Sequence, residues 1–141
     1  MLKWGIIGFL LLTGLSVNAK DKCFVTVKLK AKKHKGHFAV ALFSSERGFP
    51  GKQDKTIRKS YWPASKRQQV TFENLACGEY AVAVIQDLNA NKKLDKNFFG
   101  LPKEPFGFSQ NPTIFFGAPS FKRAAFSVTN EKEIVIDLKG N

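Results

Sequence analysis

Oxygen-bearing residues recur at every second position of one stretch that directly follows an apolar run. The side chains are those of Asp87, Asn89, Asn91 and Asp95, and the backbone carbonyl of Lys93 falls between the last two. Calcium takes six to eight oxygen ligands, and loops that hold it offer them at alternating positions. The spacing therefore predicts a calcium site formed by these five residues.

The loop departs from the EF-hand pattern at two places. Position 6 is Lys92 rather than glycine, and position 12 is Phe98 rather than glutamate. Glu104 is the nearest replacement for that carboxylate, provided that the chain folds back. Because Lys92, Lys93 and Lys96 oppose the negative charge, we expect a dissociation constant of about 0.1 to 1 mM. The alternative is a loop whose side chains bond their own backbone and hold no ion.

Three acidic residues, Asp87, Asp95 and Glu104, are the best candidates for the paired carboxylates of a glycan hydrolase. The sequence does not fix their separation, and a wet polar loop offers no means of raising the pKa of one of them. The zinc-peptidase, serine-hydrolase and phosphate-binding glycine motifs are absent. The sequence therefore favours a non-catalytic protein with calcium as its one cofactor candidate.

The first nineteen residues predict a secretory signal peptide. Lys3 precedes an apolar run from Ile6 to Leu12, and Val17 to Ala19 form a small-residue cleavage pattern. The run is shorter than the roughly 20 residues that a spanning helix needs, although a retained anchor is the alternative. We expect residues 1–19 to be removed, which leaves a single domain at 20–141, secreted into the periplasm and not membrane-spanning.

The remaining chain has an apolar period of two, which is typical of strands. This alternation predicts strands within 23–29, 38–42, 70–72, 80–85, 121–128 and 133–138, and a short one within 56–61. Residues 80–85 are apolar on both faces, so their strand should be central. About seven short strands without an amphipathic helix predict an all-β fold, an antiparallel β-sandwich.

The two cysteines, Cys23 and Cys77, predict a disulfide if the chain is exported. The bond would close a loop of 54 residues and stabilise the fold by about 3 to 4 kcal/mol. A catalytic thiol or a metal ligand has no support, because His34 and His37 lie in a lysine-rich turn without a signature that links them to either cysteine.

Several motifs resemble known proteins. Leu75, Gly78 and Tyr80 resemble a turn of transthyretin-like and collagen-adhesin-B-like sandwiches. The chain as a whole resembles the secreted bacterial family known as domain of unknown function 2141, through residues 78–84, 87–95, 99–109 and 117–121. This resemblance implies an extracytoplasmic β-sandwich with an acidic loop and no assigned catalysis. The chain departs from the family at Lys92, where glycine is usual, and at Gln86 and Leu88, which replace more polar residues.

The segment from residue 98 to 121 is a long loop rich in phenylalanine. Its aromatic residues are Phe98, Phe99, Phe106, Phe108, Phe115, Phe116 and Phe121. They could pack on the sandwich as a satellite core. They could instead line a groove for a glycan, peptide or lipid chain, with Phe99, Phe106, Phe108 and Ser109 as contacts and Glu104 and Gln110 as polar guides.

The formal net charge is +12, and its densest cluster surrounds the first predicted hairpin. The cluster comprises Lys28, Lys30, Lys32, Lys33 and Lys35. One interpretation is an adhesion-type module that binds anionic envelope components, with an affinity that falls with salt. The other is a hairpin whose charges prevent aggregation. Nucleic acid is a poor partner, because the predicted location is wrong and no aromatics alternate with these lysines.

Overall fold

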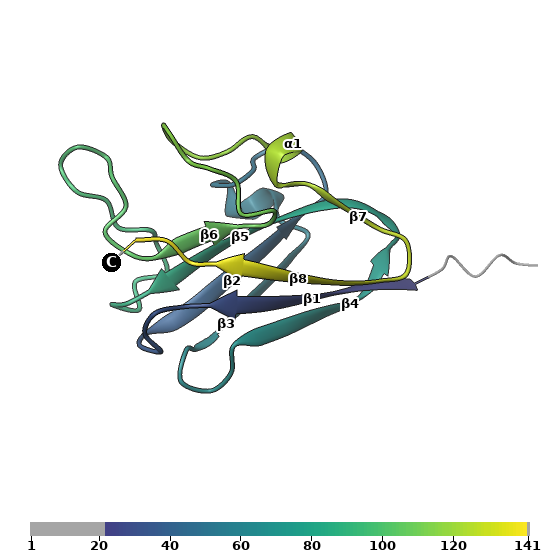
Figure 1. Cartoon of the computed structure of the whole chain (residues 1–141), viewed down its shortest axis with the longest axis horizontal. Helices are drawn as coiled ribbons and strands as arrows, with labels where there is room; N and C mark the ends of the chain where they lie inside the picture. The colour runs from purple at the N-terminus through teal and green to yellow at the C-terminus, as the bar shows by residue number, and fades with distance from the viewer. Residues whose placement is uncertain (1–21, 141) are drawn as a thin grey trace, which may run out of the picture.

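The computed structural model describes residues 22–140, without the side chain of Gln53, so the predicted signal peptide lies outside the described residues. Two sheets pack face to face, as Figure 1 shows, one with the order β4-β1-β8 and one with the order β3-β2-β5-β6, in which β7 also pairs with β5. The strands are β1 (Lys22–Lys30), β2 (His37–Phe43), β3 (Arg58–Pro63), β4 (Gln69–Ala76), β5 (Gly78–Asp87), β6 (Phe106–Phe108), β7 (Phe126–Val128) and β8 (Glu131–Asp137). A 3-10 turn spans Gln53–Lys55, and the helix α1 spans Phe121–Ala124. The predicted all-β class is confirmed, with eight strands in this part of the chain.

The core lies between the sheets and follows the predicted alternation. In β1 the buried side chains are those of Cys23, Val25, Val27 and Leu29, and every second residue of β2 is buried as well. The strand β5 is central, because β2 lies along one edge and β6 and β7 lie along the other. Burial of these alternating positions is the main stabilising contribution to the fold.

One strand pairing departs from the antiparallel prediction. The first and last strands, β1 and β8, run parallel, with Phe24 opposite Glu131 and Lys30 opposite Asp137. The edge of β1 that faces away from β8 is taken by β4. Since the chain crosses from β7 in the other sheet before it enters β8, the usual hairpin constraint on direction does not apply.

The strand predicted within 121–128 forms only at its end. Residues 121–124 are the single turn of α1, where Ser120 caps the helix by accepting a hydrogen bond from the Arg123 amide. Only Phe126–Val128 pairs with β5. A short apolar run with polar neighbours fits both periods, and the N-terminal serine favours the helix.

The corner between β4 and β5 is fixed in two ways. The predicted disulfide joins Cys23 and Cys77, whose Cα atoms are 5.1 Å apart. The buried Tyr80 donates its hydroxyl proton to the carbonyl oxygen of Ala76, four residues upstream. In Figure 1 the arrows of β1, β5 and β8 all point to the left, so the opposite end of β5 opens on that side, into the predicted calcium loop.

Candidate functional site

Asp87, the last residue of β5, anchors the loop that follows it. Its side chain is fully buried. One carboxylate oxygen accepts hydrogen bonds from the Lys92 amide at 2.8 Å and from the Tyr61 hydroxyl at 2.9 Å. The other accepts one from the Asn91 amide at 3.3 Å. The chain from 88 to 92 therefore turns around this single carboxylate.

These hydrogen bonds decide the charge of Asp87. Burial alone would raise the pKa of its carboxyl, but donors from Lys92, Tyr61, Asn91 and Ala90 outweigh burial and hold the pKa below its ordinary value. The pKa of Tyr61 moves upward, because of burial first and then of its hydrogen bond to Asp87. Asp87 is thus ionised at neutral pH and Tyr61 is neutral.

The side chains at positions 3, 5 and 9 of the loop meet. Asp95 accepts hydrogen bonds from the side-chain amides of Asn89, at 2.6 Å, and of Asn91, at 2.8 Å. Rotation of either amide by 180° exchanges its nitrogen for its oxygen, so the same side chains can present oxygens at this point. In the structure, the side-chain oxygen of Asn91 accepts a hydrogen bond from the Lys93 amide at 3.0 Å.

The chain folds back so that Glu104 contacts the loop, as its proposed role requires. Its buried carboxylate accepts the Leu88 amide at 2.9 Å on one oxygen and the Asp95 amide at 3.1 Å on the other. The backbone of Lys103 also donates to the Asp95 carbonyl, at 2.8 Å. Glu104 therefore clamps the start of the loop to its end.

Lys92 occupies the position where the EF-hand pattern has glycine. Its φ is +61°, the left-handed conformation that glycine adopts most easily, so the backbone takes a conformation suited to glycine although the residue is lysine. Its ammonium nitrogen lies 5.5 Å from the centre of the Tyr61 ring, within the range of a cation–π contact.

Of the predicted ligand residues, the structure joins Asn89, Asn91 and Asp95 through their side chains. Asp87 and Glu104 bond backbone amides of the same loop instead. The hydrogen bonds just described are those of a loop that bonds its own backbone. No cluster of three or more His, Cys, Asp or Glu suited to a metal ion lies within residues 22–140. A cation at this place would need amide and carbonyl oxygens beside the carboxylates.

Three residues that position the loop or the neighbouring turn between β1 and β2 were not predicted. Tyr61 reaches Asp87 from β3, and the buried Gln86 donates from its amide to the carbonyls of Lys33 and Lys35 at 2.7 and 2.8 Å. A Cβ on Gly36 would lie 2.2 Å from the Asp87 carbonyl, so glycine is required there for close approach. The sequence did contain signals for two of them, because Gln86 is a polar residue within an apolar strand and Gly36 directly precedes another apolar strand.

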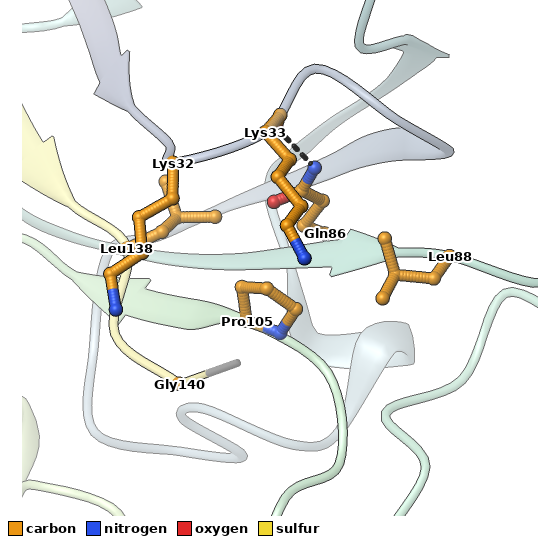
Figure 2. A pocket seen from close by; sticks show the side chains of 7 residues that line it. All are labelled: Lys32, Lys33, Gln86, Leu88, Pro105, Leu138 and Gly140. Atoms are coloured by element: carbon orange, nitrogen blue, oxygen red, sulfur yellow. Dashed lines mark hydrogen bonds between the residues drawn. The ribbon is translucent and has the colours of Figure 1, made fainter.

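The predicted first hairpin does not form, because β1 and β2 lie in different sheets and only a turn joins them. A shallow pocket of about 100 Å³ lies between this turn and the loop (Figure 2). Its walls are Lys32, Lys33, Gln86, Leu88, Pro105, Leu138 and Gly140. Sites for small organic ligands usually measure roughly 300 to 1,000 Å³. This pocket is too small for such a ligand.

The four predicted ligand contacts do not form one groove. Phe106 and Phe108 are half-buried, and their rings meet at 5.9 Å. Ser109 is fully buried, where its hydroxyl accepts from the Val82 amide at 2.9 Å and donates to the Ala124 carbonyl. Phe99 lies apart from them, in the loop between β5 and β6, and its side chain is 83% exposed. Ser109 therefore joins β5 to α1 and cannot guide a ligand in this conformation.

The predicted basic cluster also divides. Lys28 lies 2.9 Å from the carboxylate of Glu133 and Lys30 lies 4.0 Å from that of Asp137, both across the parallel pairing. The other members, Lys32, Lys33 and Lys35, are exposed in the turn between β1 and β2. The turn alone is a candidate for anion binding.

Fold and site together define a small disulfide-linked β-sandwich with a polar loop at the end of its central strand. No helix among the described residues has the length and apolarity that a bilayer crossing requires. Residues 25–136 match the family described as "Uncharacterized protein conserved in bacteria (DUF2141)", and the chain belongs to this family. Searches of curated proteins and of solved structures found no match to the chain.

Proposed function

We propose that this protein is a secreted, periplasmic, non-catalytic binding or structural module whose loop 87–104 is stabilised by calcium. The observation that carries the proposal is the convergence of Asn89, Asn91 and Asp95 beside the ionised Asp87, with Glu104 closing the loop. Export is supported by the Cys23–Cys77 disulfide, since such bonds persist in oxidising compartments.

In the proposed bound state the two asparagine amides turn their oxygens inward beside the carboxylate of Asp95. The carboxylate oxygen of Asp87 that accepts the Asn91 amide at 3.3 Å makes a longer hydrogen bond than the other oxygen makes with Lys92 or Tyr61, so it is the one proposed to turn to a cation. Lysines in the loop reduce the attraction, which supports a millimolar rather than a micromolar site. The ion would stiffen the segment that carries Phe98 and Phe99.

Thermal unfolding of the oxidised protein tests this function. We expect calcium at 10 mM, compared with chelator, to raise the melting temperature. For a dissociation constant of about 0.1 to 1 mM, this concentration stabilises the folded state by about 1.4 to 2.7 kcal/mol. Asp95→Asn should remove the rise. Asp54→Asn, which changes an exposed aspartate outside the loop, should retain it. An unchanged melting temperature in calcium, with Asp95→Asn still destabilising, would mean that the side chains only cap the turn.

A second candidate function is adhesion to anionic envelope surfaces through the turn between β1 and β2. It is supported by the hydrogen bonds from Gln86, which hold this lysine-rich turn in a defined shape. The triple variant with Lys32, Lys33 and Lys35 changed to Glu should then lose binding to an anionic polysaccharide such as heparin. Asp95→Asn should leave that binding unchanged, which separates the two functions.

A further inference from the structure

Two loops flank β6, and each carries an exposed pair of phenylalanines. The first loop, 88–105, presents Phe98 and Phe99, which are 96% and 83% exposed, and the second, 109–120, presents Phe115 and Phe116, which are 79% and 99% exposed. In Figure 1 both loops project toward the upper left of the sandwich. Four aromatic rings so fully in water are costly, since burial of each would be favourable by about 1.5 to 3 kcal/mol.

The first loop ends where the three-residue strand β6 begins, and the second loop starts where β6 ends, so residues 105 and 109, at the bases of the two loops, are separated by about 13 Å along the strand. Lys139 joins both bases. Its backbone pairs with Phe106 at 2.8 and 2.9 Å, and its ammonium group donates to the Pro112 carbonyl at 3.4 Å. Both loops are therefore anchored at β6, and Figure 1 shows that they project from the same side of the sandwich.

The first tip is a formed turn. The side-chain oxygen of Asn97 accepts the amides of Phe99 and Leu101 at 2.9 and 3.0 Å, and the Asn97 amide donates to the Leu101 carbonyl at 2.8 Å. Because the polar backbone of the tip is bonded internally, the two rings are presented outward at little backbone cost. Arg123 of α1 holds the second loop by donating a hydrogen bond to the Thr113 carbonyl at 2.7 Å.

Exposed charge on these two loops is mainly basic. Asp95 is half-buried, and its carboxylate accepts hydrogen bonds from the side-chain amides of Asn89 and Asn91. The carboxylates of Asp87 and Glu104 are turned inward and buried. The basic side chains of these loops and of α1 are exposed, and they are Lys92, Lys93, Lys96 and Lys103 in the first loop and Lys122 and Arg123 after the second. The outer surface therefore combines aromatic rings with cations.

We propose that these two loops insert Phe98, Phe99, Phe115 and Phe116 into the interface of a bilayer that contains anionic lipids, while the surrounding lysines contact lipid phosphates. Protruding rings need a soft apolar phase rather than a groove, and aromatic residues flanked by cations are typical of peripheral membrane binding. A second copy of this chain fits less well, because it would bring like charges together.

The experiment is flotation of the exported, purified protein, with its N-terminus defined by mass spectrometry, on vesicles. Phosphatidylglycerol with phosphatidylethanolamine is compared with phosphatidylcholine. We expect binding to the anionic vesicles, weakened by salt, and a decrease of about tenfold or more in partitioning for Phe98→Ser with Phe99→Ser and for Phe115→Ser with Phe116→Ser. The matched control, Val135→Ser, changes an exposed apolar residue on β8 and should bind as the wild type does.

A second measurement separates insertion from adsorption. Tryptophan at position 99 or 116, from Phe99→Trp or Phe116→Trp, should shift its emission to the blue on anionic vesicles and be quenched by brominated acyl chains, whereas Val135→Trp should not. The proposal is overturned if wild type does not bind these vesicles, or if it binds and the serine pairs bind equally well, which would leave the lysine-rich turn as the contact. It is also overturned if the serine pairs abolish self-association in sedimentation instead of vesicle binding. None of these results depends on the response to calcium.

Discussion

The two ends of β5 are held by different forces. At its beginning, the Cys23–Cys77 disulfide and the Tyr80 hydroxyl fix a short corner against the core. At its end, the carboxylates of Asp87 and Glu104 fix a long loop through backbone amides. A covalent bond and a neutral hydrogen bond are indifferent to acid and cations, whereas carboxylates are not. We therefore expect the first end to determine global stability and the second to respond to solution conditions.

The largest effect should come from removal of the disulfide. Cys23→Ala with Cys77→Ala should lower the free energy of unfolding by about 3 to 4 kcal/mol, because the unfolded chain regains the entropy of a 54-residue loop. Urea unfolding of oxidised wild type and double variant measures this. Any response of the loop to calcium should persist in the variant. Loss of that response together with the disulfide would show that the two ends are coupled.

At the other end, Asp87→Asn should lower the free energy of unfolding by about 2 to 3 kcal/mol. The amide keeps the shape but places an NH2 group against donors that need an acceptor, inside a buried site. Asp137→Asn is the matched control. Its carboxylate is exposed and 4.0 Å from Lys30, so a loss within about 0.5 kcal/mol is expected. Equal losses in the two variants would contradict a special role for Asp87.

Acid should weaken the second end selectively. The folded state holds the pKa of Asp87 below its unfolded value of about 4, so its stabilisation is complete above that pH and is lost as the pH falls through the folded pKa. The stability gap of about 2 to 3 kcal/mol between wild type and Asp87→Asn should therefore narrow toward zero in acid. Urea midpoints from pH 7 to 2 follow this gap. A gap that stays constant would mean that the carboxylate is not the responsive group.

The sequence predicted the elements better than their contacts. Alternation in β1, β2 and β5 identified strands, because burial of one strand face requires an apolar residue at every second position. The spacing from Asp87 to Asp95 identified the loop residues for the same local reason. Tyr61 could not be found in this way, because it meets Asp87 only through the pairing of β3 with β2.

The aromatic segment shows the same limit. Seven phenylalanines in a loop have no period to indicate which of them face the protein. The structure packs Phe108 and Phe121 around Phe49, with ring centres 6.0 and 5.8 Å from it, and leaves Phe98 and Phe116 in solvent. Which phenylalanines are packed and which are exposed depends on where β6 and α1 lie against the sheet. Those positions are set by contacts between residues far apart in the sequence.

The smallest expected changes in stability come from two matched substitutions, one at each end of β5, and they compare the two ends most directly. Tyr61→Phe and Tyr80→Phe each remove one hydroxyl that donates to an oxygen, a carboxylate in the first case and a carbonyl in the second. Each should lower the free energy of unfolding at pH 7 by about 1 kcal/mol. Both tyrosines have raised pKa values, mainly through burial, so both are neutral throughout acid and neutral pH.

Acid should then separate the two variants. The cost of Tyr61→Phe should decrease as Asp87 gains a proton, because a hydrogen bond to a neutral carboxyl is weaker than one to a carboxylate. The cost of Tyr80→Phe should stay constant, since its acceptor is the Ala76 carbonyl, which does not titrate in this range. Urea midpoints of wild type and both variants at pH 7 and pH 3 provide the test. Parallel changes in the two variants would mean that acid acts on the whole sandwich, and the two ends of β5 would then differ in their bonds but not in their response.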